Sequence, residues 1–207
     1  MPAAIVVERG KVDYEEVPIP CRAPGKVLVK TSLASICGSD LHAVYTQLIR
    51  EFPLAPGATG HESVGEVVDG GETHFVTGDL VLTIPKISDA RAFAGYQLIE
   101  PRQLLKLPDT KPLHHLLMSQ QLGTVIFACK RLPTMAGKTA VVIGQGSAGL
   151  FHNFILRKLG TSRIIAIEPV PSRLALGKTL GIDAAIDVTN RAATDAVMDF
   201  TSGKGAD

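Results

Sequence analysis

Runs of valine, isoleucine and leucine recur through the first third of the chain, and clusters of proline and glycine separate them. Short runs of such residues bounded by turn residues are typical of β-strands. We predict strands at four of these runs: Ala3–Val7, Val27–Thr31, Ser63–Val68 and Leu80–Ile84. Because short strands at close spacing favour closed or layered β-structures, this region is expected to form a β-barrel or a sandwich.

The hydrophobic pattern changes after Pro108. From Leu113 to Leu132 the apolar residues recur at helical spacing, with Pro112 near the first turn and Pro133 ending the run. Proline is tolerated in the first turn of a helix and disfavoured beyond it, so these positions mark its two ends. We therefore predict one long helix in this segment.

Beyond Gly137, compact apolar runs alternate with helical patterns, which is typical of a parallel sheet with crossover helices. The predicted elements are a strand at Thr139–Ile143, a helix from about Ala148 to Leu159, a strand at Arg163–Ile167, a helix at Ser172–Leu180, a strand at Ala184–Asp187 and a third helix near the end. A doubly wound domain normally has more than three strands. We therefore expect an N-terminal fragment of a longer protein, with domains at 1–132 and 133–207.

The composition excludes several classes of function. The 207 residues carry a net charge of +1, which gives no electrostatic reason to bind nucleic acid or an anionic membrane. No apolar run is long enough to span a bilayer. Three cysteines (Cys21, Cys37 and Cys129) are an odd and sparse set that does not indicate a disulfide framework. A reducing cytoplasm is the expected location.

A glycine-rich turn lies between the strand at Thr139–Ile143 and the helix that follows it. Gly144-Gln145-Gly146-Ser147-Ala148-Gly149 fits the pattern G-x-G-x-x-G. Gly144 allows the tight turn, Gly146 lets the backbone approach a pyrophosphate, and Gly149 permits close packing of helix and strand. The free N–H groups at the helix start, beginning with Ser147 and Ala148, suit the phosphates. The turn therefore predicts a dinucleotide site.

An acidic residue at the end of the next strand sharpens this prediction. A carboxylate at Glu168, nineteen residues after Gly149, can accept hydrogen bonds from both ribose hydroxyls and repels a 2′-phosphate. This favours NAD over NADP, although Arg173 is a second candidate contact because an arginine can pair with a 2′-phosphate. The alternative is a glycine-rich turn of an unrelated α/β protein with Glu168 merely solvated.

Two short clusters in the β-rich part carry metal-binding residue types. The first is Cys37-Gly38-Ser39-Asp40-Leu41-His42 and the second is Gly60-His61-Glu62. A catalytic zinc ion needs three protein ligands and one open position, and thiolate, imidazole and carboxylate are its usual donors. Cys37 and His61 can supply two of them from separate loops, and Asp40 can orient a ligating histidine. Taken singly, each has a plainer interpretation as a buried cysteine or a structural histidine.

Taken in order, these motifs resemble the zinc-dependent medium-chain alcohol dehydrogenases. The matching features are C-G-S-D-x-H, G-H-E, the strand Gly78-Asp79-Leu80-Val81, the strand Phe93-Ala-Gly-Tyr96 and the turn at Gly144. The resemblance runs over the whole chain. It implies a GroES-like catalytic domain followed by a partial Rossmann nucleotide-binding domain, an α/β fold with an N-terminal β-barrel.

The resemblance also implies roles for individual residues. Cys37 and His61 would be zinc ligands, Asp40 would support His61, and Glu62 would sit behind the metal. Ser39 would touch the substrate oxygen, and His42 would pass the proton towards solvent. The zinc ion would act as a Lewis acid on a small-molecule alcohol, and the hydride would pass to NAD.

The sequence departs from the family's pattern at two positions. The third ligand is commonly a cysteine or a glutamate, and alignment with polyol and sugar dehydrogenases puts Gln120 there. The hypothesis is therefore a site of Cys37, His61, Gln120 and Glu62, with the choice between the last two open. The family's four-cysteine lobe is also missing, since Pro85–Ala92 contains no cysteine. One catalytic zinc and no structural zinc are expected.

Two other functions stay open at this point. One is a zinc-free oxidoreductase similar to quinone reductases, and the other is a non-catalytic, nucleotide-binding or assembly subunit. The missing C-terminal part would complete the nucleotide sheet, and the full-length protein is expected to be a homo-oligomer. A fragment of this kind can expose apolar surface and lack activity, and whether this chain is active alone is left open. The substrate is not predicted beyond a polyol, a sugar or a secondary alcohol.

Overall fold

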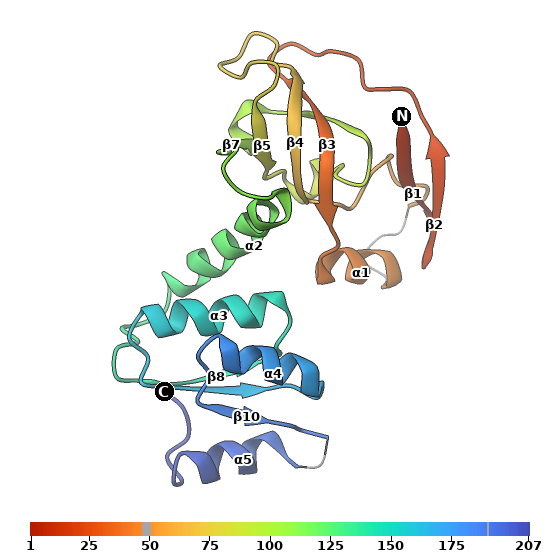
Figure 1. Cartoon of the computed structure of the whole chain (residues 1–207). Coiled ribbons are helices and arrows are strands. Elements are labelled where there is room, and N and C mark those ends of the chain that lie inside the picture. The colour runs from red at the N-terminus through yellow and green to blue at the C-terminus, as the bar shows by residue number, and fades with distance from the viewer. Residues whose placement is uncertain (47–50, 190) are drawn as a thin grey trace. The chain divides into compact units, whose positions relative to one another are not determined.

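The first unit of the computed structural model is built on a five-stranded antiparallel sheet (Figure 1). Its strands lie in the order β6 (Tyr96–Ile99), β3 (Val27–Ser35), β4 (Glu62–Asp69), β5 (Leu80–Thr83) and β7 (Leu104–Lys106). A separate antiparallel hairpin is formed by β1 (Pro2–Glu8) and β2 (Lys11–Glu16). The short helix α1 (Gly38–Tyr45) follows β3, and single turns of 3₁₀-helix lie at Ile87–Asp89 and Pro101–Gln103. The structure describes residues 1–46, 51–189 and 191–207.

The four strands predicted in this unit are confirmed, as β1, β3, β4 and β5. Closure of the strands into a barrel stays a prediction, because β6 and β7 are the edges of the hydrogen-bonded sheet. The predicted strand at Phe93–Tyr96 is wrong in its bounds, since β6 begins only at Tyr96. The preceding residues bond instead to β1, with Ala4 N–H donating to Phe93 O at 2.9 Å and Gly95 N–H to Pro2 O at 2.9 Å.

Apolar residues cover both faces of the five-stranded sheet. Alternation along a strand sends successive side chains to opposite faces. Val27, Val29 and Val67 belong to one cluster, and Val64 and Leu82 belong to another. The second cluster also contains Leu116 and Leu117 from the first turns of α2 (Leu113–Cys129), which therefore packs on that face. The predicted helix at Leu113–Leu132 is confirmed with an earlier end.

The second unit is a three-stranded parallel sheet in the order β10-β9-β8 (Figure 1). The chain runs through β8 (Thr139–Ile143), α3 (Ser147–Lys158), β9 (Arg163–Ile167), α4 (Pro171–Thr179), β10 (Ala184–Ile186) and α5 (Ala193–Phe200). Ala140, Val142 and Ile164 cluster with Leu156 of α3, whereas Ile165 and Ile167 cluster with Ala196 of α5. Helices thus cover both faces, as predicted for a βαβ arrangement.

The two units are Met1–Gln120 and Gln121–Asp207, so their division falls inside α2. The boundary predicted between residues 132 and 133 stays a prediction. None of the helices among the described residues has the length and apolar character needed to cross a membrane.

The βα turn of the second unit contains a very close backbone approach. A Cβ atom on Gly149 would lie 1.9 Å from the carbonyl oxygen of Gly144, whereas a Cβ atom on Gly146 would have no neighbour within 4 Å. We expect Gly149→Ala to destabilise the β8–α3 connection by about 3 kcal/mol, since a backbone carbonyl must move. Hydrogen exchange of the segment Thr139–Lys158 measures this, and faster exchange by roughly two orders of magnitude is the expected result. Gly146→Ala is the matched control, and equal exchange in both variants would contradict the packing argument.

Candidate metal centre and nucleotide turn

The pairing of β3 with β4 brings two distant segments to one end of the sheet. Ser35, the last residue of β3, pairs directly with Glu62, the first residue of β4. Opposed residues of an antiparallel pair place their side chains on the same face. Cys37 follows Ser35 by two residues, and His61 immediately precedes Glu62. The strand register therefore brings the thiol and the imidazole together.

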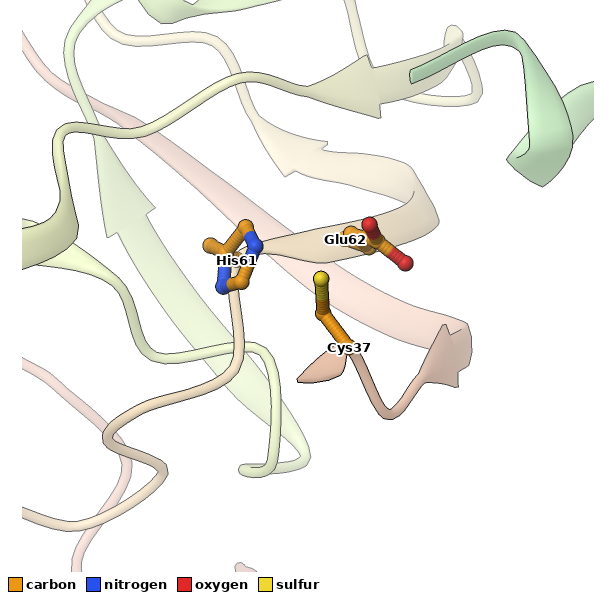
Figure 2. A group of neighbouring side chains, drawn as sticks. All are labelled: Cys37, His61 and Glu62. Carbon is orange, nitrogen blue, oxygen red and sulfur yellow. The ribbon is translucent and has the colours of Figure 1, made fainter. Parts of the chain in front are cut away.

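Cys37, His61 and Glu62 form a compact group of metal-binding side chains. One donor atom from each residue lies within 4.8 Å of the other two. Figure 2 shows the sulfur of Cys37 pointing towards the space between the His61 ring and the Glu62 carboxylate. A zinc ion lies about 2.0–2.3 Å from each ligand atom, so donors this close need only small side-chain rotations to share one ion. The thiolate, imidazole and carboxylate set therefore fits a divalent zinc ion.

Asp40 is the buried polar residue behind this group, with only 3% of its surface exposed. Its carboxylate accepts hydrogen bonds from the backbone N–H of Cys37 at 2.8 Å and from the hydroxyl of Thr59 at 2.8 Å. Its Oδ1 also lies 3.2 Å from Nδ1 of His61. Nδ1 also lies 3.3 Å from the backbone carbonyl oxygen of Thr59, so its proton faces two acceptors and Nε2 of His61 is left as the nitrogen with a lone pair for a metal ion.

The hydrogen bond between Asp40 and His61 changes the acidity of both groups. It raises the pKa of His61 to about 9, while burial acts in the opposite direction. Burial would raise the pKa of Asp40, but hydrogen bonds from His61, from the Cys37 backbone and from Thr59 outweigh it and hold that pKa below its usual value. In the metal-free protein His61 is therefore protonated at neutral pH. An incoming metal ion must displace this proton.

Helix α1 carries three of the predicted site residues. We expected the Cys37 cluster on a loop, but Ser39, Asp40 and His42 lie in α1 and Cys37 is its N-cap residue. Ser39 Oγ is 3.5 Å from Nε2 of His61. His42 is exposed and lies three residues further along the same helix. Residues three apart on a helix are neighbours on its surface, so Ser39 and His42 share one face.

Gln120, the other predicted ligand, is half-buried in α2 of the first unit. Its role as a ligand stays a prediction.

The histidine and glutamate of the G-H-E cluster differ in burial, since His61 is half-buried and Glu62 is only 5% exposed.

The glycine-rich turn has the local geometry that its sequence predicts. Gly144 has a φ of +88°, in the left-handed region that favours glycine, and its N–H donates to Ile167 O at 2.8 Å. Gly146 is the N-cap of α3, so Ser147 and Ala148 are the first helical residues. Their N–H groups have no acceptor within the helix, which is the usual basis of phosphate binding at such turns.

Glu168 follows β9 and is buried, with 3% of its surface exposed, so the alternative of a merely solvated Glu168 is wrong. Its Oε2 accepts a hydrogen bond from Gln145 N–H at 2.7 Å, and its Oε1 accepts one from Val170 N–H at 3.0 Å. Arg173 Nη1 lies 3.9 Å from Oε1, in a loose ion pair with an exposed arginine. The carboxylate is thus fixed beside the turn by the backbone.

Several known proteins are similar to this chain over most of its length. A model of the alcohol dehydrogenase GroES-like domain matches residues 23–109. The L-threonine 3-dehydrogenase of Bacillus velezensis is 30% identical over 93% of this chain, and the sorbitol dehydrogenase of Gallus gallus is 30% identical over 90% of it. Residues 23–109 therefore form an alcohol dehydrogenase GroES-like domain, and the chain is similar to these dehydrogenases over nearly its whole length. The resemblance found in the sequence motifs is therefore confirmed.

A solved alcohol dehydrogenase shares the fold. The alcohol dehydrogenase of Thermus sp. ATN1 superposes with a TM-score of 0.85 at 26% identity, covering 100% of this chain and 69% of that one. The present chain spans about three-fifths of the length of the L-threonine 3-dehydrogenase and of the sorbitol dehydrogenase, 63% and 61% respectively.

Sequence reasoning missed the residues that support the candidate metal centre and the glycine-rich turn from behind. Ser35 donates a hydrogen bond to Glu62, and Thr59 donates one to Asp40. In the second unit, the fully buried Gln145 side chain accepts a hydrogen bond from Asn153 at 2.7 Å. These partners are 8 to 27 residues apart. The only local signals were two hydroxyl residues near predicted ligands, Ser35 two residues before Cys37 and Thr59 two residues before His61.

Asp40→Asn tests the coupling between Asp40 and His61. The amide has nearly the shape of the carboxylate but no charge, so NMR titration of the metal-free protein should move the His61 pKa from about 9 towards 6.5. The interaction stabilises the folded state fully below the ordinary pKa of 6.5 and is lost as the pH rises through about 9. The variant should therefore lose more unfolding free energy at about pH 6 than at about pH 10.

Glu66→Gln is the control for this measurement. Glu66 is an exposed acid on β4, and the same chemical change there should leave the His61 pKa and the unfolding free energy unmoved. An Asp40→Asn variant with the wild-type His61 titration would contradict the assignment of Asp40.

Proposed function

We propose that this protein is a zinc-dependent oxidoreductase that moves a hydride between an alcohol and a nicotinamide dinucleotide. The observation that carries the proposal is the grouping of Cys37, His61 and Glu62 with Asp40 on the remaining nitrogen of the imidazole. The same chain contains a strand–turn–helix segment with the glycines and the acid of a dinucleotide site. A zinc-free oxidoreductase would have no use for the grouped side chains of Cys37, His61 and Glu62.

Cys37 and His61 are proposed to hold the metal ion, with Glu62 and Gln120 as candidates for the third protein ligand. A neutral amide oxygen is a weaker donor than a carboxylate, so Glu62 is the stronger candidate on chemistry, whereas Gln120 is the family position. When bound, zinc supplies a Lewis acid that lowers the pKa of an alcohol, and NAD supplies the hydride acceptor. One zinc ion per chain is proposed, because Pro85–Ala92 lacks the cysteines of a structural lobe.

The chain's own residues would move the proton. Ser39 Oγ lies beside the donor group, 3.5 Å from His61 Nε2, so it is suited to accept the hydroxyl proton of an alcohol there. His42 is the next titratable side chain on the exposed surface of α1 and can take that proton to solvent. Asp40 keeps the His61 ring oriented throughout.

The dinucleotide is proposed to bind at the Gly144–Gly149 turn. Both carboxylate oxygens of Glu168 already accept a backbone N–H, and each oxygen retains a lone pair for a ribose hydroxyl. Negative charge at this point disfavours a 2′-phosphate, which supports a preference for NAD. The substrate class is an alcohol, and the names of the relatives make L-threonine and sorbitol the first compounds to try.

Cys37→Ser tests the metal-dependent part of the proposal. Loss of a thiolate ligand should weaken zinc binding by roughly two orders of magnitude or more and should abolish alcohol-dependent reduction of NAD. Zinc per chain, zinc affinity by competition with a chelator, and NADH formation over a panel of secondary alcohols and polyols are the measurements. Cys21→Ser is the matched control, because Cys21 is exposed and outside the group.

Three results would overturn the proposal in different ways. A wild-type protein that binds NAD but no zinc would favour the zinc-free oxidoreductase. A protein that binds NAD and zinc but oxidises no alcohol would favour a non-catalytic subunit. Equal loss of zinc in Cys21→Ser and Cys37→Ser would remove Cys37 as the ligand.

Glu168→Gln tests the choice of cofactor. Removing the charge while keeping the shape should lower the preference for NAD over NADP by roughly tenfold, equivalent to about 1.4 kcal/mol of binding free energy. Binding of both dinucleotides by calorimetry measures the ratio. Arg173→Gln should change the ratio in the opposite direction, because it removes a cation that can pair with a 2′-phosphate. An unchanged ratio in Glu168→Gln would exclude this carboxylate as the discriminating group.

A further inference from the structure

Ser35 lies outside the predicted site and forms a hydrogen bond with one of its members, Glu62. Its hydroxyl donates a hydrogen bond to Oε2 of Glu62 at 2.5 Å. The two residues are direct partners in the β3–β4 register, at the last pair before the chain turns into Cys37 on one side and His61 on the other. Because both backbones are fixed by the sheet, this contact is built into the strand ends.

The burial of Glu62 gives the contact its importance. Only 5% of the residue is exposed, so its carboxylate depends on neighbouring donors or cations for the solvation it loses. The carboxylate lies in the same group as the Cys37 thiol and the His61 imidazole. Two interactions therefore compete for it, the hydroxyl proton of Ser35 and a cation bound between the three side chains.

We propose that Ser35 is a positioning residue that holds the Glu62 carboxylate back from the metal and thereby sets how readily Glu62 becomes a ligand. The inference rests on the proposed zinc site. A hydrogen bond from the hydroxyl stabilises the carboxylate rotamer in which Oε2 faces β3, and rotation towards an ion has to break or lengthen that bond. A buried carboxylate without the hydroxyl has the cation as its best remaining partner, so it moves towards the ion.

Ser35→Ala separates this role from a purely structural one. The loss of one hydrogen bond to a charged group should raise zinc affinity by roughly tenfold, because Glu62 then compensates its charge at the ion. In the protein loaded with cobalt(II) in place of zinc, the visible absorption bands should change as a carboxylate enters the coordination sphere. A structural role alone would lower stability without tightening metal binding. Ser35→Thr keeps the hydroxyl and should retain the wild-type affinity and spectrum.

A double-mutant cycle with Glu62→Gln identifies the partner. The amide cannot compensate the ion's charge as a carboxylate does, so Ser35→Ala should have no effect on zinc affinity or on the cobalt spectrum in the Glu62→Gln background. Ser32→Ala is the matched control, since Ser32 is an exposed serine on the same strand. Circular dichroism and NAD binding show whether each variant is folded.

The outcomes of the two proposals differ. Wild-type protein that takes up neither zinc nor cobalt overturns the proposed function. The role of Ser35 alone is overturned if the wild-type protein binds both metals but Ser35→Ala leaves zinc affinity unchanged or lowers it. It is also overturned if Ser35→Ala changes zinc affinity by the same factor in the Glu62→Gln background. Tighter binding and an altered spectrum that both vanish with Glu62→Gln support it.

Discussion

The antiparallel register that pairs Ser35 with Glu62 is the constraint on which the candidate metal centre depends. Side chains alternate between the two faces of a sheet, so a shift of one residue along either strand would turn one member of the pair to the opposite face. Cys37 and His61 lie just beyond this pair, 24 residues apart in the sequence. Their proximity is therefore a property of two strand ends, and it persists as long as β3 and β4 keep their alignment.

Asp40 joins this sheet geometry to the chemistry of the imidazole. Its carboxylate accepts the Cys37 N–H at the start of α1 and the Thr59 hydroxyl ahead of β4, and it lies beside Nδ1 of His61. Burying an unpaired carboxylate costs several kcal/mol, and these donors offset that cost. One side chain thus connects the helix start, the approach to β4 and the His61 imidazole, on the ring nitrogen that does not face the proposed metal ion. Its removal would affect the local fold and the site together.

The sequence predicted those elements whose signals are local. The bounds of β8 and β9 follow from compact apolar runs closed by glycine and by an acid, and they agree with the structure. Helix α1 was not predicted, because eight residues are too short a segment for a helical period to be recognised and its first two residues are glycine and serine. The motif residues Cys37, His61 and Glu168 were found as candidates. The burial of Glu62 and the contacts of Ser35, Thr59 and Asn153 were not, since each depends on a partner brought near by tertiary structure.

Both units contain a buried carboxylate that is hydrogen-bonded to the backbone beside the candidate site. In each unit a buried acid accepts a backbone N–H that lies next to the candidate site: Asp40 in α1 accepts the N–H of its N-cap residue Cys37, and Glu168 after β9 accepts that of Gln145. The donor residue is in turn a ligand candidate or part of the cofactor turn. A carboxylate in this position fixes the path of the backbone and the local charge with one interaction. Replacement of either acid by a small apolar residue would therefore alter the backbone path and the local charge at once. An isosteric amide keeps the shape of the side chain and removes only its charge. The amide variants are thus the ones that separate the chemistry of these acids from their packing.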